Sequence, residues 1–139
     1  MKIRNYVHER DLEAVLDLWA NAGGGIHLSI SDRPEEIRKK LRRDADLFLV
    51  AERGGQIVGT VLGGFDGRRG MVYHLAVKQP LRRKGIGRRL MRELESRLRA
   101  KGCLKYYLLV SPDNHEAQEF YRTLGWERME LQVMGKVIG

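Results

Sequence analysis

A short basic loop with two glycines is the stretch of this sequence best suited to bind an anion. It reads Arg82-Arg83-Lys84-Gly85-Ile86-Gly87-Arg88 and follows the apolar stretch 71–77. Backbone N–H groups at a helix N-terminus bind phosphate, because the helix dipole favours negative charge there. Gly85 and Gly87 would let the backbone approach a phosphate without an intervening Cβ. The loop therefore predicts a phosphate site at the start of a helix.

Two other phosphate-binding patterns do not match this loop. The P-loop requires Lys followed by Ser or Thr after its last glycine, whereas Gly87 is followed by Arg88 and Arg89. The dinucleotide-binding pattern GxGxxG lacks its third glycine, because Leu90 stands there. A helix start with solvated arginines remains the alternative for the loop considered alone.

The segment 114–126 carries a tyrosine that could act as an acid. Asn114 can cap a helix there. The apolar stripe of that helix contains Ala117, Phe120, Tyr121 and Leu124. A phenol with a pKa near ~10 can donate a proton to a leaving thiolate at neutral pH. Tyr121 is therefore a candidate general acid, and a core aromatic on an amphipathic helix is the alternative.

The two stretches together resemble the signatures of the GNAT family of N-acetyltransferases. Leu75-Ala76-Val77 followed by Arg82-x-x-Gly85-x-Gly87 is similar to the acyl-CoA-binding signature of that family. Residues 114–126 (NHEAQEFYRTLGW) resemble its second signature, N-x-x-A-x-x-F-Y-x-x-L-G-F, with Trp126 in place of the final phenylalanine. The resemblance extends along nearly the whole chain.

This resemblance implies an acetyl-CoA-dependent N-acetyltransferase in which a primary amine attacks the thioester directly in a ternary complex. The backbone of the glycine loop would hold the pyrophosphate of coenzyme A, and Tyr121 would lie near the thioester sulfur. The residues expected to contact the cosubstrate are Leu75, Ala76, Val77, Arg82, Arg83, Lys84, Gly85, Ile86, Gly87, Arg88, Asn114, Ala117 and Tyr121. No metal is expected, and the resemblance is compatible with a homodimer.

The group that removes a proton from the acceptor amine is not evident on the strand before the loop. Strict alternation along 71–77 places Tyr73 and Leu75 on one face and His74 on the other. In the family that this chain resembles, the usual base positions fall on Met71 and Tyr73, and neither side chain is a good base. The alternation directs His74 away from the site and favours a packed histidine.

Two groups outside this strand remain as candidate bases. An alkyl amine is mostly protonated at pH 7 and must lose a proton before it attacks. Glu52 ends a neighbouring strand and ranks first, acting through water, and His27 in a glycine-containing loop ranks second. Cys103 has no evident histidine partner and is interpreted as a small buried residue.

The apolar periodicity predicts the elements that must position these residues. Strands are expected at 2–7, 47–52, 56–65, 71–77, 104–110 and 126–137, the last as one strand or as two separated by Gly135. Helices are expected at 8–20, 32–45, 86–100 and 114–124. Strands 71–77 and 104–110 are joined by a helix and should be parallel. If they separate after Val77, an amide-rich arm could satisfy their unpaired backbone groups. The order matches an α/β fold of the α+β type, the GNAT fold, with a mixed sheet of six to seven strands and about four helices.

The composition fits a single domain covering residues 1–139. The 26 Lys and Arg exceed the 18 Asp and Glu, and the net charge of +8 favours a polyanionic partner. Much of this charge surrounds the glycine loop, so the phosphates of coenzyme A explain it better than nucleic acid does. A non-catalytic acyl-CoA sensor and a small nucleic-acid-binding protein remain the alternatives.

The sequence also predicts the cellular compartment of the protein and the kind of acceptor it uses. The single cysteine excludes an intrachain disulfide. No apolar run approaches ~20 residues, and the N-terminus lacks the apolar core of a signal peptide. We therefore expect a cytoplasmic protein with no nucleic-acid or membrane partner. Its acceptor, a small-molecule or protein amine, is expected at loops 21–33 and 65–70.

Overall fold

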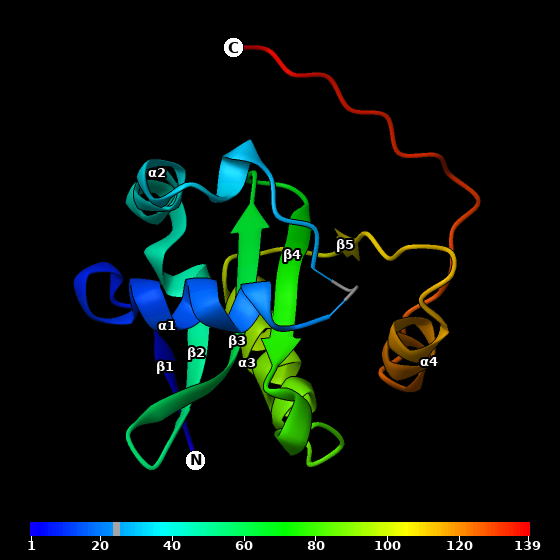
Figure 1. Cartoon of the computed structure of the whole chain (residues 1–139). Coiled ribbons are helices and arrows are strands. Elements are labelled where there is room, and N and C mark those ends of the chain that lie inside the picture. The colour runs from blue at the N-terminus through cyan, green and yellow to red at the C-terminus, as the bar shows by residue number, and fades with distance from the viewer. Residues whose placement is uncertain (24–25) are drawn as a thin grey trace.

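The computed structural model describes residues 1–23 and 26–139 and consists of a twisted sheet with helices on both faces (Figure 1). The helices are α1 (His8–Ala20), α2 (Pro34–Asp44), α3 (Ile86–Ala100) and α4 (His115–Thr123). The strands are β1 (Lys2–Asn5), β2 (Phe48–Arg53), β3 (Gln56–Phe65), β4 (Gly70–Val77) and β5 (Tyr106–Leu108). The predicted bounds of α1 and β3 are confirmed. Gly24 and Gly25, part of the predicted acceptor loop, lie outside the described residues.

The five strands follow each other in the sheet in chain order, β1-β2-β3-β4-β5. The first four are antiparallel neighbours. Short turns connect β2 to β3 and β3 to β4, whereas α1 and α2 lie between β1 and β2 in the chain. β4 and β5 are parallel, since α3 connects them. The predicted parallel pair is therefore confirmed.

Each face of the sheet has its own apolar core. On one face, α1 and α2 contribute Val15, Trp19 and Ile37, which pack with Phe48. On the other face, the stripe of α3 is fully buried at Leu90 and Leu94. A Cβ on Gly63 of β3 would lie only 2.5 Å from Leu94 Cδ1, so α3 packs closely on the sheet because this position has no side chain.

A β-bulge interrupts β4 beside β3. Leu62 pairs with His74 and Gly63 pairs with Val72, which leaves Tyr73 as an extra residue on β4. Val72 and Leu75 both pack toward the α3 core, whereas Ala76 packs toward α1. The prediction that alternate residues share one face along the whole strand was wrong, because the bulge reverses the alternation in its middle.

The C-terminal part of the chain also differs from the prediction. β5 has only three residues, and 104–105 and 109–110 do not extend it. Residues 126–139, all of which the structure describes, form no helix or strand, and the chain from 128 onward projects from the body (Figure 1). The alternating side chains Leu131 and Val133 are 72% and 69% exposed. The sheet therefore has five strands and not six to seven, because alternation alone does not supply a hydrogen-bonding partner.

None of the helices within the described ranges is long and apolar enough to cross a membrane. β1 ends at Asn5, two residues before the predicted end, because α1 begins at His8. Gly125 adopts φ 93° after Leu124, the C-cap residue of α4, as expected for a glycine that ends a helix.

Candidate active site

A cleft opens where β4 and β5 diverge. The two strands pair only over Gly70–Val72 and Tyr106–Leu108, so they separate after Val72 and not, as predicted, after Val77. The cleft has a volume of about 80 Å³. It is lined by His27, Val72, Tyr73, Leu75, Leu108, Leu109, Val110, Ser111, Asn114, Ala117 and Tyr121. Two segments far apart in the sequence, the strand before the glycine loop and α4, thus form its opposite walls.

The glycine loop has the backbone geometry that anion binding requires. Gly85 is the N-cap residue of α3 with φ 85°, and Arg83 is also left-handed with φ 64°. The first backbone hydrogen bond of the helix runs from Arg89 N–H to the Gly85 carbonyl at 3.1 Å. The N–H groups of residues 86–88 therefore precede the helical ladder, and no acidic residue stands in the first turn.

Arg82 has a structural position within the loop. Its Nε donates to the Val77 carbonyl at 3.3 Å, and another guanidinium nitrogen donates to the Ala22 carbonyl. These bonds tie the loop to the end of β4 and to the segment after α1. Arg83 and Lys84 are exposed, and Arg88 is half-buried, so these three cations remain available beside the loop.

α4 places the two polar residues of the second signature at the cleft. Asn114 caps the helix, since its Oδ1 accepts a hydrogen bond from the Ala117 N–H at 3.1 Å. Tyr121 lies further along the same helix and also lines the cleft. Its ring meets Phe120 and Trp126 edge-on, at centroid distances of 5.1 and 5.8 Å. Burial raises the pKa of Tyr121 to about 12, so this phenol stays protonated well above neutral pH.

The other residues predicted from the sequence lie on different faces of the sheet. Leu75 lines the cleft, while Ala76 is buried toward α1 and Val77 packs toward α3. Ile86 is buried in the α3 core. Cys103 is half-buried, and its Sγ donates to the Lys105 carbonyl at 3.3 Å, before β5.

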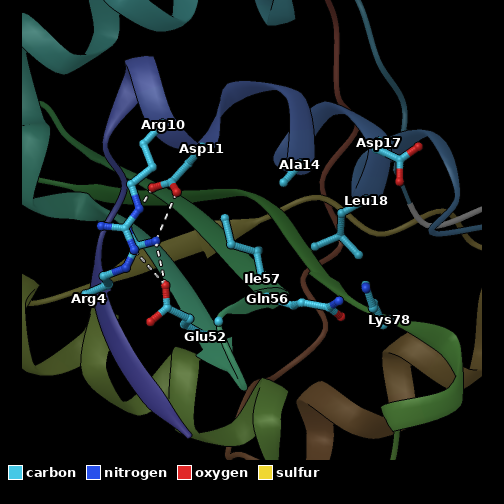
Figure 2. A pocket seen from close by; sticks show the side chains of 11 residues that line it. Arg4, Arg10, Asp11, Ala14, Asp17, Leu18, Glu52, Gln56, Ile57 and Lys78 are labelled. Carbon is cyan, nitrogen blue, oxygen red and sulfur yellow. Dashed lines mark hydrogen bonds and ion pairs between the residues drawn. The ribbon is translucent and has the colours of Figure 1, made fainter.

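Glu52 lies in a different pocket, between α1 and the ends of β1, β2 and β3 (Figure 2). Its Oε1 accepts hydrogen bonds from Arg4 at 3.1 Å and from Arg10 at 3.0 Å. Arg4 also binds both carboxylate oxygens of Asp11, at 2.7 and 2.9 Å. Burial works to raise the pKa of Asp11, but the bonds from Arg4 and from the Val7 N–H outweigh it and lower that pKa.

This second pocket is the larger of the two, at about 370 Å³, yet it does not contain the signature residues. Figure 2 shows Arg4, Asp11 and Glu52 pointing toward one another, so their charges are already compensated within the protein. The structure therefore does not bring Glu52 to the cleft. We interpret these ion pairs as a structural network that holds β1, β2 and α1 together.

His27, in contrast, reaches the cleft. Its Nε2 lies 3.0 Å from Ser111 Oγ, at the wall formed by the segment between β5 and α4. The connection between α1 and α2 therefore touches both walls, because Asp32 in the same connection contacts β4. Asp32 Oδ1 lies 2.8 Å from His74 Nε2, and both side chains are about nine-tenths buried.

Sequence reasoning missed the pairing of His74 with Asp32. Alternation placed His74 on the face opposite Leu75, as observed, but it did not reveal Asp32 on that face or the bulge that brings Tyr73 there. The only available signal was the presence of an ionisable residue in an otherwise apolar strand. The histidine ring also meets Trp19 of α1 edge-on, with centroids 4.8 Å apart.

A model of the acetyltransferase (GNAT) family matches residues 12–126. The chain belongs to this family. It is 40% identical over 136 residues to acetyltransferase ECA0875 of Pectobacterium atrosepticum, covering 98% of this chain and 94% of the relative.

Solved structures of related proteins share the fold. The chain superposes on Ard1 from Thermoplasma volcanium with a TM-score of 0.77 and 26% identity, covering 89% of this chain and 80% of Ard1. It superposes on the PaiA N-acetyltransferase from Thermoplasma acidophilum, solved in complex with coenzyme A, with a TM-score of 0.81 and 21% identity. That match covers 94% of this chain and 92% of PaiA.

Proposed function

We propose that this protein transfers the acetyl group of acetyl-CoA to a primary amine by direct attack in a ternary complex. The observation that carries the proposal is the cleft between β4 and α4, which has Leu75 on one wall and Tyr121 on the other. The glycine loop follows β4 after one 3₁₀ turn, Gln79–Leu81, so one ligand with a phosphate end and a thioester end could bind to both.

The residues present fit coenzyme A. The free N–H groups at the start of α3 would bind the pyrophosphate, and Arg83, Lys84 and Arg88 would balance its charge. Beyond Val72, the edge of β4 that faces away from β3 has no strand beside it among the described residues. The amide groups of a pantetheine arm could pair with this edge as an added strand would.

Tyr121 supplies the acid in the proposed reaction. The neutral amine nitrogen forms a bond to the thioester carbonyl carbon, the carbon–sulfur bond breaks, and the departing thiolate accepts the phenolic proton. The acylated nitrogen loses its extra proton to solvent, and the Tyr121 phenolate regains a proton from solvent. A phenol is protonated throughout the neutral range, and the raised pKa of Tyr121 keeps it so at higher pH as well. Backbone N–H groups at Leu75 and Val77 would stabilise negative charge on the carbonyl oxygen.

The acceptor would enter from the face of the sheet that carries α1 and α2. The connection at 26–33 reaches the cleft there through His27. The acceptor is a small-molecule or protein amine, and the relatives support the acetyltransferase class without defining this chain's own acceptor.

The proposal is tested by incubating the protein with acetyl-CoA and separate amines: a peptide with a free N-terminus, lysine, spermidine and an aminoglycoside. Thiol release and the mass gain of one acetyl group on the amine are followed together. We expect both signals, in equal amounts, with at least one amine. Binding of acetyl-CoA without turnover over the whole panel would contradict catalysis and favour the acyl-CoA sensor.

A further inference from the structure

The bulge in β4 places two consecutive side chains on the face that carries α1 and α2. A Cβ on Gly64 would lie 3.0 Å from the Tyr73 ring and 3.5 Å from Lys40 Nζ of α2, so Tyr73 lies on that face. His74 lies on it too, against Trp19 of α1. Tyr73 also lines the acyl cleft, which makes His74 the next residue along the strand from the cleft wall.

The contact with Asp32 selects one tautomer of His74. A carboxylate only accepts hydrogen bonds, so the Nε2 that lies 2.8 Å from Asp32 Oδ1 must carry the proton. The other ring nitrogen, Nδ1, then has a free lone pair in the neutral imidazole. It forms no hydrogen bond with any of the described residues and is not among the fully buried side-chain atoms that lack a partner.

Asp32 is itself held in place. Its Oδ2 accepts a hydrogen bond from the Ser29 N–H at 2.9 Å, within a capping box at the 3₁₀ turn Ile30–Asp32. One oxygen of the Asp32 carboxylate therefore binds the turn, and the other contacts His74. This is the arrangement by which a carboxylate fixes the tautomer and orientation of a catalytic histidine.

We propose that His74 is the general base of the acetyl transfer and that Asp32 is its positioning residue. The inference rests on the proposed function. His74 Nδ1 takes a proton from the ammonium group of the acceptor, and the freed nitrogen lone pair forms the bond to the acetyl carbon. The imidazolium formed shares its Nε2 proton with Asp32 and later loses the Nδ1 proton to solvent.

The surroundings of His74 favour this assignment over the other candidates. From α1 the neighbour is Trp19 and from β3 it is Leu62, both uncharged. Asp32 is the carboxylate in direct contact. Lys40 of α2, beside Tyr73, is paired with Asp44 at 2.6 Å.

His27, the other candidate base, contacts a hydroxyl group and not a carboxylate. It is exposed and bonded to the hydroxyl of Ser111, which does not fix its tautomer, because a hydroxyl both donates and accepts. A base at His27 would also have to give up this contact to receive a proton through Nε2.

The test compares His74→Gln, Asp32→Asn and His27→Gln with the wild type. His8→Gln is the control, since that histidine is buried beside Tyr6 at the start of α1. Turnover and KM for the best amine of the panel are measured between pH 5.5 and pH 9. Melting temperature and acetyl-CoA affinity are measured for each variant, so that a folding defect is recognised.

We expect His74→Gln to lower kcat by roughly a hundredfold, within the range for general-base catalysis, with acetyl-CoA affinity unchanged. The acidic limb of the pH–rate profile should disappear in this variant. Asp32→Asn should have a similar effect, because an amide can donate to Nε2 and move the ring proton to Nδ1. His8→Gln should keep wild-type turnover.

One readout needs no acceptor. The ¹⁵N resonances of the His74 ring should show the Nε2–H tautomer in the wild type and a shift toward Nδ1–H in Asp32→Asn. A wild-type Nδ1–H tautomer would overturn the assignment. So would normal turnover in His74→Gln, or a loss confined to His27→Gln. If the wild type itself transfers no acetyl group to any amine, the proposed function fails first and the inference fails with it.

Discussion

Gly87 in the first turn of α3 lies directly against Phe120 of α4. A Cβ at Gly87 would lie 3.2 Å from Phe120 Cζ and 3.8 Å from Leu75 Cδ2. The glycine of the phosphate loop therefore sets the distance between the two halves of the proposed site. Tyr121 follows Phe120 on the same helix, so the position of the phenol depends on this contact.

Substitution of Gly87 by alanine should change catalysis more than binding. The added methyl would push on Phe120 by a few tenths of an ångström, and α4, which has no fully buried residue, can move in response. We expect acetyl-CoA affinity to fall less than about fivefold and kcat to fall more, on the order of tenfold, because small misplacements are costly in catalysis. Calorimetry and steady-state rates measure the two effects. An equal fall in both would contradict the coupling.

Gly85 offers a pair of variants that differ only in charge. It adopts φ 85° with no atom within 4 Å of the position that a Cβ would occupy, and both Asn and Asp tolerate the left-handed region. Gly85→Asp should lower acetyl-CoA affinity at least roughly tenfold more than Gly85→Asn, since a carboxylate at the loop repels phosphate. Isothermal titration at low and high salt measures the difference. Equal affinities would show that the phosphates bind elsewhere.

Removal of the Tyr121 hydroxyl should lower turnover by roughly tenfold or more, as expected for loss of a general acid. Tyr121→Phe keeps the ring contacts with Phe120 and Trp126, so the fold and the affinity for acetyl-CoA should be unchanged. Tyr107→Phe is the matched control. That tyrosine lies on β5 near Arg69 and Lys105 and does not line the cleft. Wild-type turnover in Tyr121→Phe would remove Tyr121 from the mechanism.

Stability should fall above about pH 10. Burial raises the pKa of Tyr121 to about 12 and also raises the pKa values of Tyr6 and Tyr106. The unfolded chain then loses these protons near pH ~10 while the folded protein keeps them, so the free energy of unfolding decreases as pH rises. Urea unfolding at pH 8, 9, 10 and 11 measures this. The substitution Tyr106→Phe should make the free energy of unfolding decrease less steeply with pH. An unchanged pH dependence would contradict a raised pKa of Tyr106.

The sequence alone predicted the helices and turns whose residue pattern lies within one short stretch of the chain. The stripe Leu90, Leu94 and Leu98 defines α3, and Gly54-Gly55 defines the hairpin between β2 and β3. The cleft wall on α4 was also predictable, because Asn114 and Tyr121 belong to one helix with a visible cap.

The features that the sequence did not predict depend on contacts between distant segments. The bulge at Tyr73 arises from the pairing of β4 with β3, and it brings Tyr73 onto the same face as His74. Glu52 was ranked first as a base from its place at a strand end, but Arg4 and Arg10 bind it. The apolar alternation at 126–137 predicted a strand, yet no neighbouring edge within the described part of the chain pairs with it.

Whether the glycine loop and the cleft bind acetyl-CoA is measured by the melting temperature of the protein with and without it. At a free concentration of about 100 times Kd, binding stabilises the folded state by about 2.7 kcal/mol. For a chain of this length, that corresponds to a rise of several degrees. We predict this rise with acetyl-CoA and its absence with NAD. No rise with acetyl-CoA, even at low salt, would show that the protein does not bind it.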